Sequence, residues 1–296
     1  MVAGAFCQIF TCLHEWYGPD CCNNIRNSKA STAQKRTVGT SAWLCWVLNF
    51  YQCSEGPFMS LTGDVLCGRV WSVAHSVQRR HLVASTSDDG TVRLWAGQGL
   101  RASAGVLRPA GGAPVCGAAF CSGDGNLLAL AAADCRAYVY DLRATASPLA
   151  VLAAHTRPVS YARFLGRGEV VTASTDGSLA LWDVAAAAAG GAPGARAGLS
   201  RTFRGHVNAK NFVGLAVCER ERLLATGSET GAAVGYHTSW ATPLAARAVV
   251  RARGPGAREF VSAIAWRPDS AGSRGPVLAT ALSNGDVRML QLVAAA

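Results

Sequence analysis

Hydrophobic and polar residues alternate in short runs over residues 67–293, and these runs come in pairs joined by a tight turn. A two-residue alternation is typical of β-strands, because successive side chains point to opposite faces of the sheet. The five paired segments are LVASTSDDGTVRLW (82–95), LLALAAADCRAYVY (127–140), EVVTASTDGSLALW (169–182), LLATGSETGAAVGY (223–236) and VLATALSNGDVRML (277–290). The alternating segments that precede them are RVWSVAH, PVCGAAF, PVSYARF, FVGLAV and FVSAIAW. The pattern therefore predicts five copies of one antiparallel unit.

The spacing of the copies identifies the architecture. The turns are anchored at Asp89, Asp134, Asp176, Thr230 and Asn284, which are 45, 42, 54 and 54 residues apart. A period of about 40 to 45 residues is typical of the WD repeat, in which each repeat forms a four-stranded blade of a β-propeller. We therefore predict an all-β WD-repeat propeller with five recognisable blades of an expected seven. Five blades would leave the ring open, and the pattern favours missing N-terminal repeats over degenerate blades within residues 1–66.

The repeats also carry a set of polar residues at fixed positions. In the third repeat, His155, Thr172, Asp176 and Trp182 stand where the WD repeat links loop, strands and turn by hydrogen bonds, so the resemblance to that repeat implies such a chain here. A neutral imidazole would donate to the carboxylate and accept from the hydroxyl. We interpret these residues as structural rather than catalytic. The other members of this predicted blade network are Ser85, Asp89, Trp95 and His206.

Charge and cysteine divide the chain near residue 66. Residues 1–66 contain four basic and four acidic residues and six of the 11 cysteines, together with His14. Zinc sites usually show paired ligands at regular spacing, whereas these gaps are irregular. Reduced thiols in a poorly ordered segment are the favoured interpretation, so we expect two regions, residues 1–66 and the propeller at 67–293, with no metal or cofactor.

Composition limits the classes of function. The net charge of +10 lies wholly downstream of residue 66, but its basic residues are scattered without interleaved aromatic residues. A nucleic-acid-binding scaffold is therefore the weaker alternative.

The longest apolar run, residues 42–48, is too short to cross a bilayer, and no basic residue precedes the first apolar stretch as in a secretory signal. We therefore expect no membrane contact. Nucleotide-binding and hydrolase motifs are also missing from the sequence, so we expect a non-enzyme.

Several stretches are more specific than a blade requires. YDLRATASPLAVLAAHTRPVSYARFL (140–165), ASTDGSLALWDV (173–184), RTFRGHVNAKNFVGL (201–215) and LLATGSET (223–230) resemble a plant light-signalling group of WD-repeat proteins. The group contains the constitutively photomorphogenic ubiquitin ligase, the suppressor-of-phytochrome proteins and the small repressors of UV-B photomorphogenesis. RGHVN (204–208) and the missing ligase-type zinc and coiled-coil patterns favour the repressors. A fragment of a ligase or of a suppressor-of-phytochrome protein is the alternative.

The resemblance implies a peptide-binding surface. In the ligase-type propeller, Val-Pro peptides of partner proteins bind at positions that correspond here to Arg69, Trp71, Arg157 and Phe212. Aromatic side chains would contact the apolar motif, and arginines would meet flanking acidic residues. Ala209 replaces the glutamate of the family pattern, so the resemblance also implies a shifted peptide preference.

The resemblance implies a second contact at Tyr140-Asp141-Leu142-Arg143, which is similar to the WDxR motif that docks propellers on the cullin-4 adaptor. Asp141 and Arg143 would make this contact. By the same resemblance, the protein would act in the nucleus and cytoplasm, bind the UV-B photoreceptor, promote its return to the inactive dimer, and serve as a receptor for ubiquitination substrates such as transcription factors.

Overall fold

The computed structural model describes residues 58–59, 65–66, 68–96, 102–109, 111–190, 196–250, 259–267 and 275–292. The six N-terminal cysteines and His14, on which the zinc alternative rests, lie outside the described residues. In the region preceding the predicted propeller, β1 (Phe58–Met59) pairs antiparallel with β2 (Val65–Leu66).

The described chain after residue 67 forms five antiparallel sheets in chain order, four with four strands and the last with three. The first comprises β3 (Val70–His75), β4 (Val83–Ser87), β5 (Val92–Ala96) and β6 (Ala102–Leu107). The second comprises β7 (Val115–Phe120), β8 (Leu127–Ala132), β9 (Ala137–Asp141) and β10 (Ala150–Leu152). The third comprises β11 (Val159–Phe164), β12 (Glu169–Ser174), β13 (Ser178–Asp183) and β14 (Leu199–Phe203). The fourth comprises β15 (Leu215–Cys218), β16 (Leu223–Gly227), β17 (Ala232–His237) and β18 (Ala245–Ala248), and the fifth β19 (Val261–Trp266), β20 (Val277–Leu282) and β21 (Val287–Gln291).

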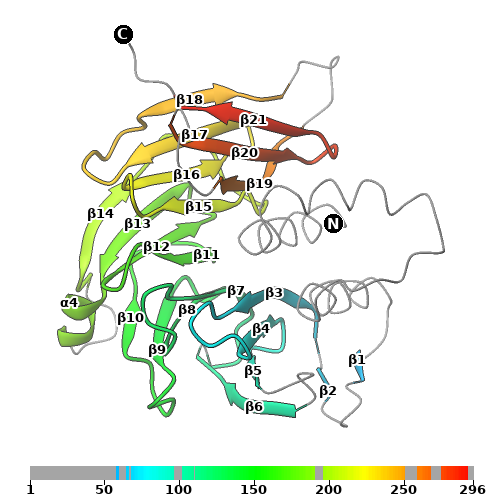
Figure 1. Cartoon of the computed structure of the whole chain (residues 1–296), viewed down its shortest axis with the longest axis vertical. Coiled ribbons are helices and arrows are strands. Elements are labelled where there is room, and N and C mark those ends of the chain that lie inside the picture. The colour runs from blue at the N-terminus through cyan, green and yellow to red at the C-terminus, as the bar shows by residue number, and fades with distance from the viewer. Residues whose placement is uncertain are drawn as a thin grey trace.

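These sheets are the blades of a propeller. Figure 1 shows them fanned in chain order around a common axis. The first strand of each blade lies innermost, and it contacts the first strand of the next blade from β3 through β7, β11 and β15 to β19. The all-β WD-repeat propeller predicted from the sequence is confirmed, with the five blades that the repeats indicated.

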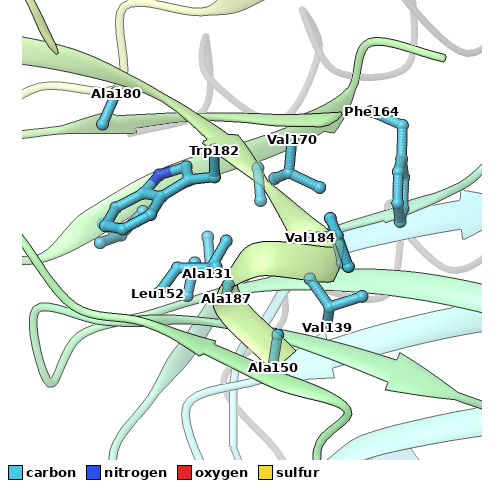
Figure 2. Close-up of a cluster of buried hydrophobic side chains, with 14 of the residues drawn as sticks. Ala131, Val139, Ala150, Leu152, Phe164, Val170, Ala180, Trp182, Val184 and Ala187 are labelled. Carbon is cyan, nitrogen blue, oxygen red and sulfur yellow. The ribbon is translucent and has the colours of Figure 1, made fainter. Parts of the chain in front are cut away.

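The core lies between blades rather than within one sheet. Four clusters of buried apolar side chains fill the four successive blade interfaces. Figure 2 shows the one between blades two and three, where Trp182 and Val170 face Leu152 and Val139. Middle strands such as β12 are therefore covered on both faces, and five of its six residues are buried. Each blade depends on its neighbours for burial of its apolar surface.

A short helix, α4 (Val184–Ala189), occupies the alanine-rich insertion between β13 and β14. The Asp183 side chain caps it by accepting a hydrogen bond from the backbone nitrogen of Ala186. The helix ends at Gly190, where glycines and a proline begin to replace the alanines. Within the described part of the chain, no helix is long and apolar enough to cross a membrane.

Candidate protein-interaction surfaces

The polar network of the third blade has the geometry that the sequence predicts. His155 Nδ1 lies 3.0 Å from the Asp176 carboxylate, and its Nε2 lies 2.7 Å from Thr172 Oγ1. The indole nitrogen of Trp182 donates to the same hydroxyl at 2.9 Å. Burial by itself raises the pKa of Asp176. Hydrogen bonds from His155 and Ser178 lower this pKa by more than burial raises it, so it lies well below its ordinary value. The network therefore fixes the loop that precedes β11.

Other blades keep parts of this network. In the first blade, Trp95 Nε1 donates to Ser85 Oγ at 3.0 Å, while Asp89 accepts from the backbone nitrogen of Thr91 at 2.9 Å. In the fourth blade, His206 Nδ1 lies 2.9 Å from the Tyr236 hydroxyl. Burial lowers the pKa of His206 to about 4, which keeps its imidazole neutral at pH 7. The Trp95–Ser85 bond joins two strands of the first blade, Asp89 closes the turn between them, and His206 joins the loop before β15 to β17.

A group of three aromatic rings from three blades, here named the aromatic face, lies at the inner ends of the blades. Trp71 of β3 stacks on Phe212 of the loop before β15, with ring centroids 5.1 Å apart and an interplanar angle of 24°. Tyr161 of β11 meets Phe212 edge-on at 5.7 Å. The Arg69 guanidinium lies over the Trp71 ring, 5.0 Å from its centroid. Three of the four predicted peptide-binding residues are thus brought together.

The stacking restricts how this face accepts a ligand. Apolar atoms in contact lie about 3.5 to 4 Å apart, so a ring inserted between two others needs about twice that spacing. The 5.1 Å between Trp71 and Phe212 leaves no such slot between the two rings. The fourth predicted residue, Arg157, is exposed four positions before Tyr161 on the third blade.

Two carboxylates that the sequence analysis missed hold the aromatic face in place. Asp88 accepts a hydrogen bond from Trp71 Nε1. Glu229 accepts from the backbone nitrogens of Lys210 and Asn211 at 2.7 and 2.8 Å, and so fixes the loop that carries Phe212. Burial raises the pKa of Glu229, but these hydrogen bonds lower it to a net value below the ordinary one.

A sequence signal for these two carboxylates does exist. Asp88 and Glu229 occupy the same position in their blades, immediately before the turn residues Asp89 and Thr230. Asp88 reaches from its turn to Trp71 near the start of β3, and Glu229 reaches from its turn to the loop before β15. The loop has Ala209 where the family pattern has a glutamate, and Glu229 of the turn supplies a carboxylate to this region instead. That carboxylate accepts hydrogen bonds from the backbone of the loop.

The predicted adaptor contact has an ordered arginine. Arg143 Nε lies 2.9 and 3.1 Å from the two carboxylate oxygens of Asp141, and its Nη2 lies 2.5 Å from one of them. The Arg143 side chain is 65% exposed. These hydrogen bonds lower the pKa of Asp141 to about 2. The planar guanidinium is therefore held at the surface by the residue two positions before it.

The described residues hold no cluster of three or more His, Cys, Asp or Glu side chains that could bind a metal ion. Their four cysteines, Cys116, Cys121, Cys135 and Cys218, are free thiols.

Comparisons with known proteins extend this picture. The family model "WD domain, G-beta repeat" matches residues 57–96 and 146–183. The first match begins upstream of the boundary predicted at residue 67, and that boundary stays a prediction. Among solved structures, a chain of "Crystal Structure of Mitotic Checkpoint Complex" superposes with a TM-score of 0.57, covering 77% of this chain and 64% of that chain at 20% identity. At that identity the superposition shows the fold alone.

Curated relatives come from plant light signalling. WD repeat-containing protein RUP1 of Arabidopsis thaliana is 42% identical over 60% of this chain and 44% of its own length. RUP2 of the same plant is 39% identical over 67% of this chain and 53% of its own length. E3 ubiquitin-protein ligase COP1 of A. thaliana is 36% identical over 76% of this chain and 31% of its own length. The chain thus spans about half, or less, of the length of these relatives.

Proposed function

The chain belongs to the plant WD-repeat light-signalling family, and on that premise we propose that it works as a protein-interaction module without catalytic activity of its own. The observation that carries the proposal is the aromatic face, where Trp71 and Phe212 stack beneath the exposed Arg69. An apolar surface with a cation at its rim suits a peptide that combines an apolar motif with acidic flanks.

In this proposal the partner is the UV-B photoreceptor, bound through a Val-Pro segment. The valine and proline contact the stacked rings of Trp71 and Phe212, and Arg69 and Arg157 meet the acidic flanks. Binding that favours the dimeric photoreceptor shifts its population toward the inactive form, and this shift needs no chemical step by the propeller.

The proposal includes a second partner, the cullin-4 adaptor, which contacts Arg143. Its guanidinium is already oriented by Asp141, so little conformational entropy is lost when an adaptor carboxylate or carbonyl accepts from its remaining N–H groups. Proteins held on the aromatic face, including the photoreceptor and transcription factors, would then become substrates of the ligase. We propose that this occurs in the nucleus and cytoplasm, which a fluorescent fusion would test.

The test is binding of the purified chain to the C-terminal Val-Pro peptide of the photoreceptor, measured by calorimetry at two salt concentrations. Trp71→Ala removes the stacked ring, and we expect at least a tenfold loss of affinity, as for a buried aromatic contact. Trp240→Ala is the matched control, because Trp240 is 54% exposed in the turn between β17 and β18 of blade four. Equal affinity of the chain and its Trp71 variant would overturn the peptide-binding proposal.

A second candidate role, a piece of a ligase or suppressor-of-phytochrome protein, is favoured by one observation. The matches to COP1 and to Protein SPA1-RELATED 3 each cover 76% of this chain, against 60% for RUP1. Sequencing of the mature messenger distinguishes the two. A zinc-binding RING or kinase-like segment encoded upstream would establish the second role, and its absence there would leave the first.

A further inference from the structure

Arginines from three blades surround one short loop, residues 121–126, which joins β7 to β8. Arg79 of the first blade bonds the Asn126 side chain through one terminal nitrogen. Arg143 of the second blade is tied to the same loop through its neighbour Leu142, whose backbone nitrogen donates to the Asn126 carbonyl at 2.8 Å. Arg167 comes from the β11–β12 loop of the third blade. We name Arg79, Arg143 and Arg167 the arginine face.

Glycines in the loop make room for two of these arginines. A Cβ atom at Gly123 would lie 2.6 Å from Cγ of Arg167, and one at Gly125 would lie 3.3 Å from Cγ of Arg79 and 2.7 Å from Cβ of Gln78. The 2.6 Å to Arg167 and the 2.7 Å to Gln78 are closer than real Cβ contacts allow, and the 3.3 Å to Arg79 is tight. The aliphatic stem of Arg167 therefore packs where a side chain at position 123 would stand, and Arg79 packs closely against position 125.

Positive charge exceeds negative charge on this face. Its carboxylates are Asp124, within the loop, Asp141, which is engaged by Arg143, and Glu219 of the fourth blade, which accepts from the Ser122 hydroxyl of the loop at 2.7 Å. Asn126 donates to Asp124 and lowers its pKa, and the charges of Arg143 and Arg167 add to that effect. The three arginines of the face and the exposed Arg80 beside Arg79 outnumber these three carboxylates by one. Each guanidinium has five N–H donors, so the bonds made within the chain leave others for a ligand.

We propose that the arginine face binds a carboxylate-rich segment of a partner protein, running across the loops of blades one to three. Clustered guanidinium groups suit carboxylates, which each of them can meet with two parallel hydrogen bonds. The interleaved Asp124 and Asp141 disfavour a nucleic-acid backbone, because a continuous line of phosphates would be repelled at both positions. An acidic peptide can place neutral residues opposite these two aspartates.

This inference goes beyond the proposed light-signalling function and does not rest on the aromatic face, but the arginine face shares Arg143 with the proposed adaptor contact. The test therefore changes Arg79 and Arg167 and leaves Arg143 in place. The two are separable, because Trp71→Ala should remove Val-Pro peptide binding and leave acidic-peptide binding unchanged. The reverse is expected when Arg79 and Arg167 are changed.

The experiment is fluorescence anisotropy with the full chain and a labelled peptide of alternating Glu and Ala, with a Gln-Ala peptide as the neutral probe. Arg79→Gln and Arg167→Gln together keep most of the packed aliphatic stem and remove two charges. We expect the double variant to bind the acidic peptide about tenfold more weakly, as the loss of two surface charge contacts predicts. Arg247→Gln with Arg204→Gln is the matched control, since both are exposed residues of the fourth-blade region outside the arginine face. Thermal unfolding checks that all variants fold.

Three outcomes would overturn the inference. One is equal binding of the Glu-Ala and Gln-Ala peptides. Another is an equal loss of affinity in the control pair, which would mean general attraction to a basic chain. The third is tighter binding of a single-stranded oligonucleotide that the Arg79 and Arg167 changes abolish, which would assign the face to nucleic acid. The inference is supported if affinity falls only in the arginine-face variant and only for the acidic peptide.

Discussion

Asp176 is the residue on which the hydrogen-bonded network of the third blade depends. Its carboxylate accepts from His155 at 3.0 Å, from the Ser178 hydroxyl at 2.6 Å and from the backbone nitrogen of Thr156 at 3.1 Å. Because its folded-state pKa lies below the unfolded value of about 4, its charged form stabilises the fold above that pH. This contribution is lost as the pH falls from about 4 toward the folded-state pKa.

We therefore expect Asp176→Asn to lower the free energy of unfolding by about 1 to 3 kcal/mol at pH 7, since it leaves buried partners poorly satisfied. The difference from the unchanged chain should shrink below pH about 4. Urea unfolding at neutral and acidic pH measures both values, and Glu221→Gln, an exposed position, serves as control. A difference that stays constant down to pH about 2 would contradict the role assigned to the charge.

Individual residues differ in how far the sequence alone could place them. Thr172 and Trp182 could be placed, because the blade period fixes which strand positions meet. The placing of Trp71 and Phe212 on one surface followed only from resemblance to a family, since 141 positions separate them. Their stacking was not predicted, because it depends on how several blades pack. Glu229 shares its blade position with Asp88, which marks it in the sequence, but its partners on the loop are mainly backbone nitrogens, which the sequence alone does not identify.

Within the blade element, the turn between the second and third strands requires a left-handed residue. Four blades place glycine there, at Gly90, Gly177, Gly231 and Gly285, with φ between 73° and 91°. The second blade instead has Cys135, with φ of 70°. A side chain in this conformation costs about 1 to 2 kcal/mol, so the turn of the second blade is strained relative to the others.

Replacing that cysteine should stabilise the protein. We expect Cys135→Gly to raise the free energy of unfolding by up to about 1 kcal/mol, because relief of the strain exceeds the added freedom of the unfolded chain. Cys135→Ala keeps the Cβ atom and should give no such gain. Urea midpoints under reducing conditions compare the three proteins, and equal gains from Gly and Ala would refute a backbone origin.

The outer strands of the blades show where element prediction from sequence ends. In the third blade, which has a neighbour on each side, the inner strands are apolar and buried at most positions, because both of their faces are covered. β21, the third strand of the last blade, is exposed or half-buried throughout. The outer strand β18 reads AARA and is exposed at every position, so no hydrophobic pattern marks it. It forms through backbone pairing with β17, which any sequence without proline can supply.

On the scale of the whole molecule, the blades are joined by polar links as well as by apolar interfaces. Ser122 of the second blade donates to Glu219 of the fourth at 2.7 Å, and Trp71 of the first stacks on Phe212 of the fourth. Arg222 of the fourth blade contacts Glu169 of the third through both terminal nitrogens, one of them at 3.0 Å. Blades far apart in the chain are thus coupled, which favours cooperative unfolding.

The Glu169–Arg222 pair allows the strength of one such link to be measured. Arg222 also donates from Nε to the Thr238 hydroxyl at 3.1 Å. This bond helps to hold the guanidinium that contacts Glu169. Since the two side chains are 42% and 28% exposed, solvent screens much of their attraction. A double-mutant cycle with Glu169→Gln and Arg222→Gln should give a coupling energy of about 1 kcal/mol.

The neighbouring pair Arg220–Glu221 provides the comparison, because it lies in the same loop but does not join two blades. Its closest atoms are 3.7 Å apart and its side chains are 76% and 46% exposed, so we expect a coupling near zero. Chemical denaturation of both cycles at low and high salt gives the two values. If the pairs couple equally, the contact between Arg222 and Glu169 adds nothing to blade association, and the apolar interfaces alone hold the third blade to the fourth.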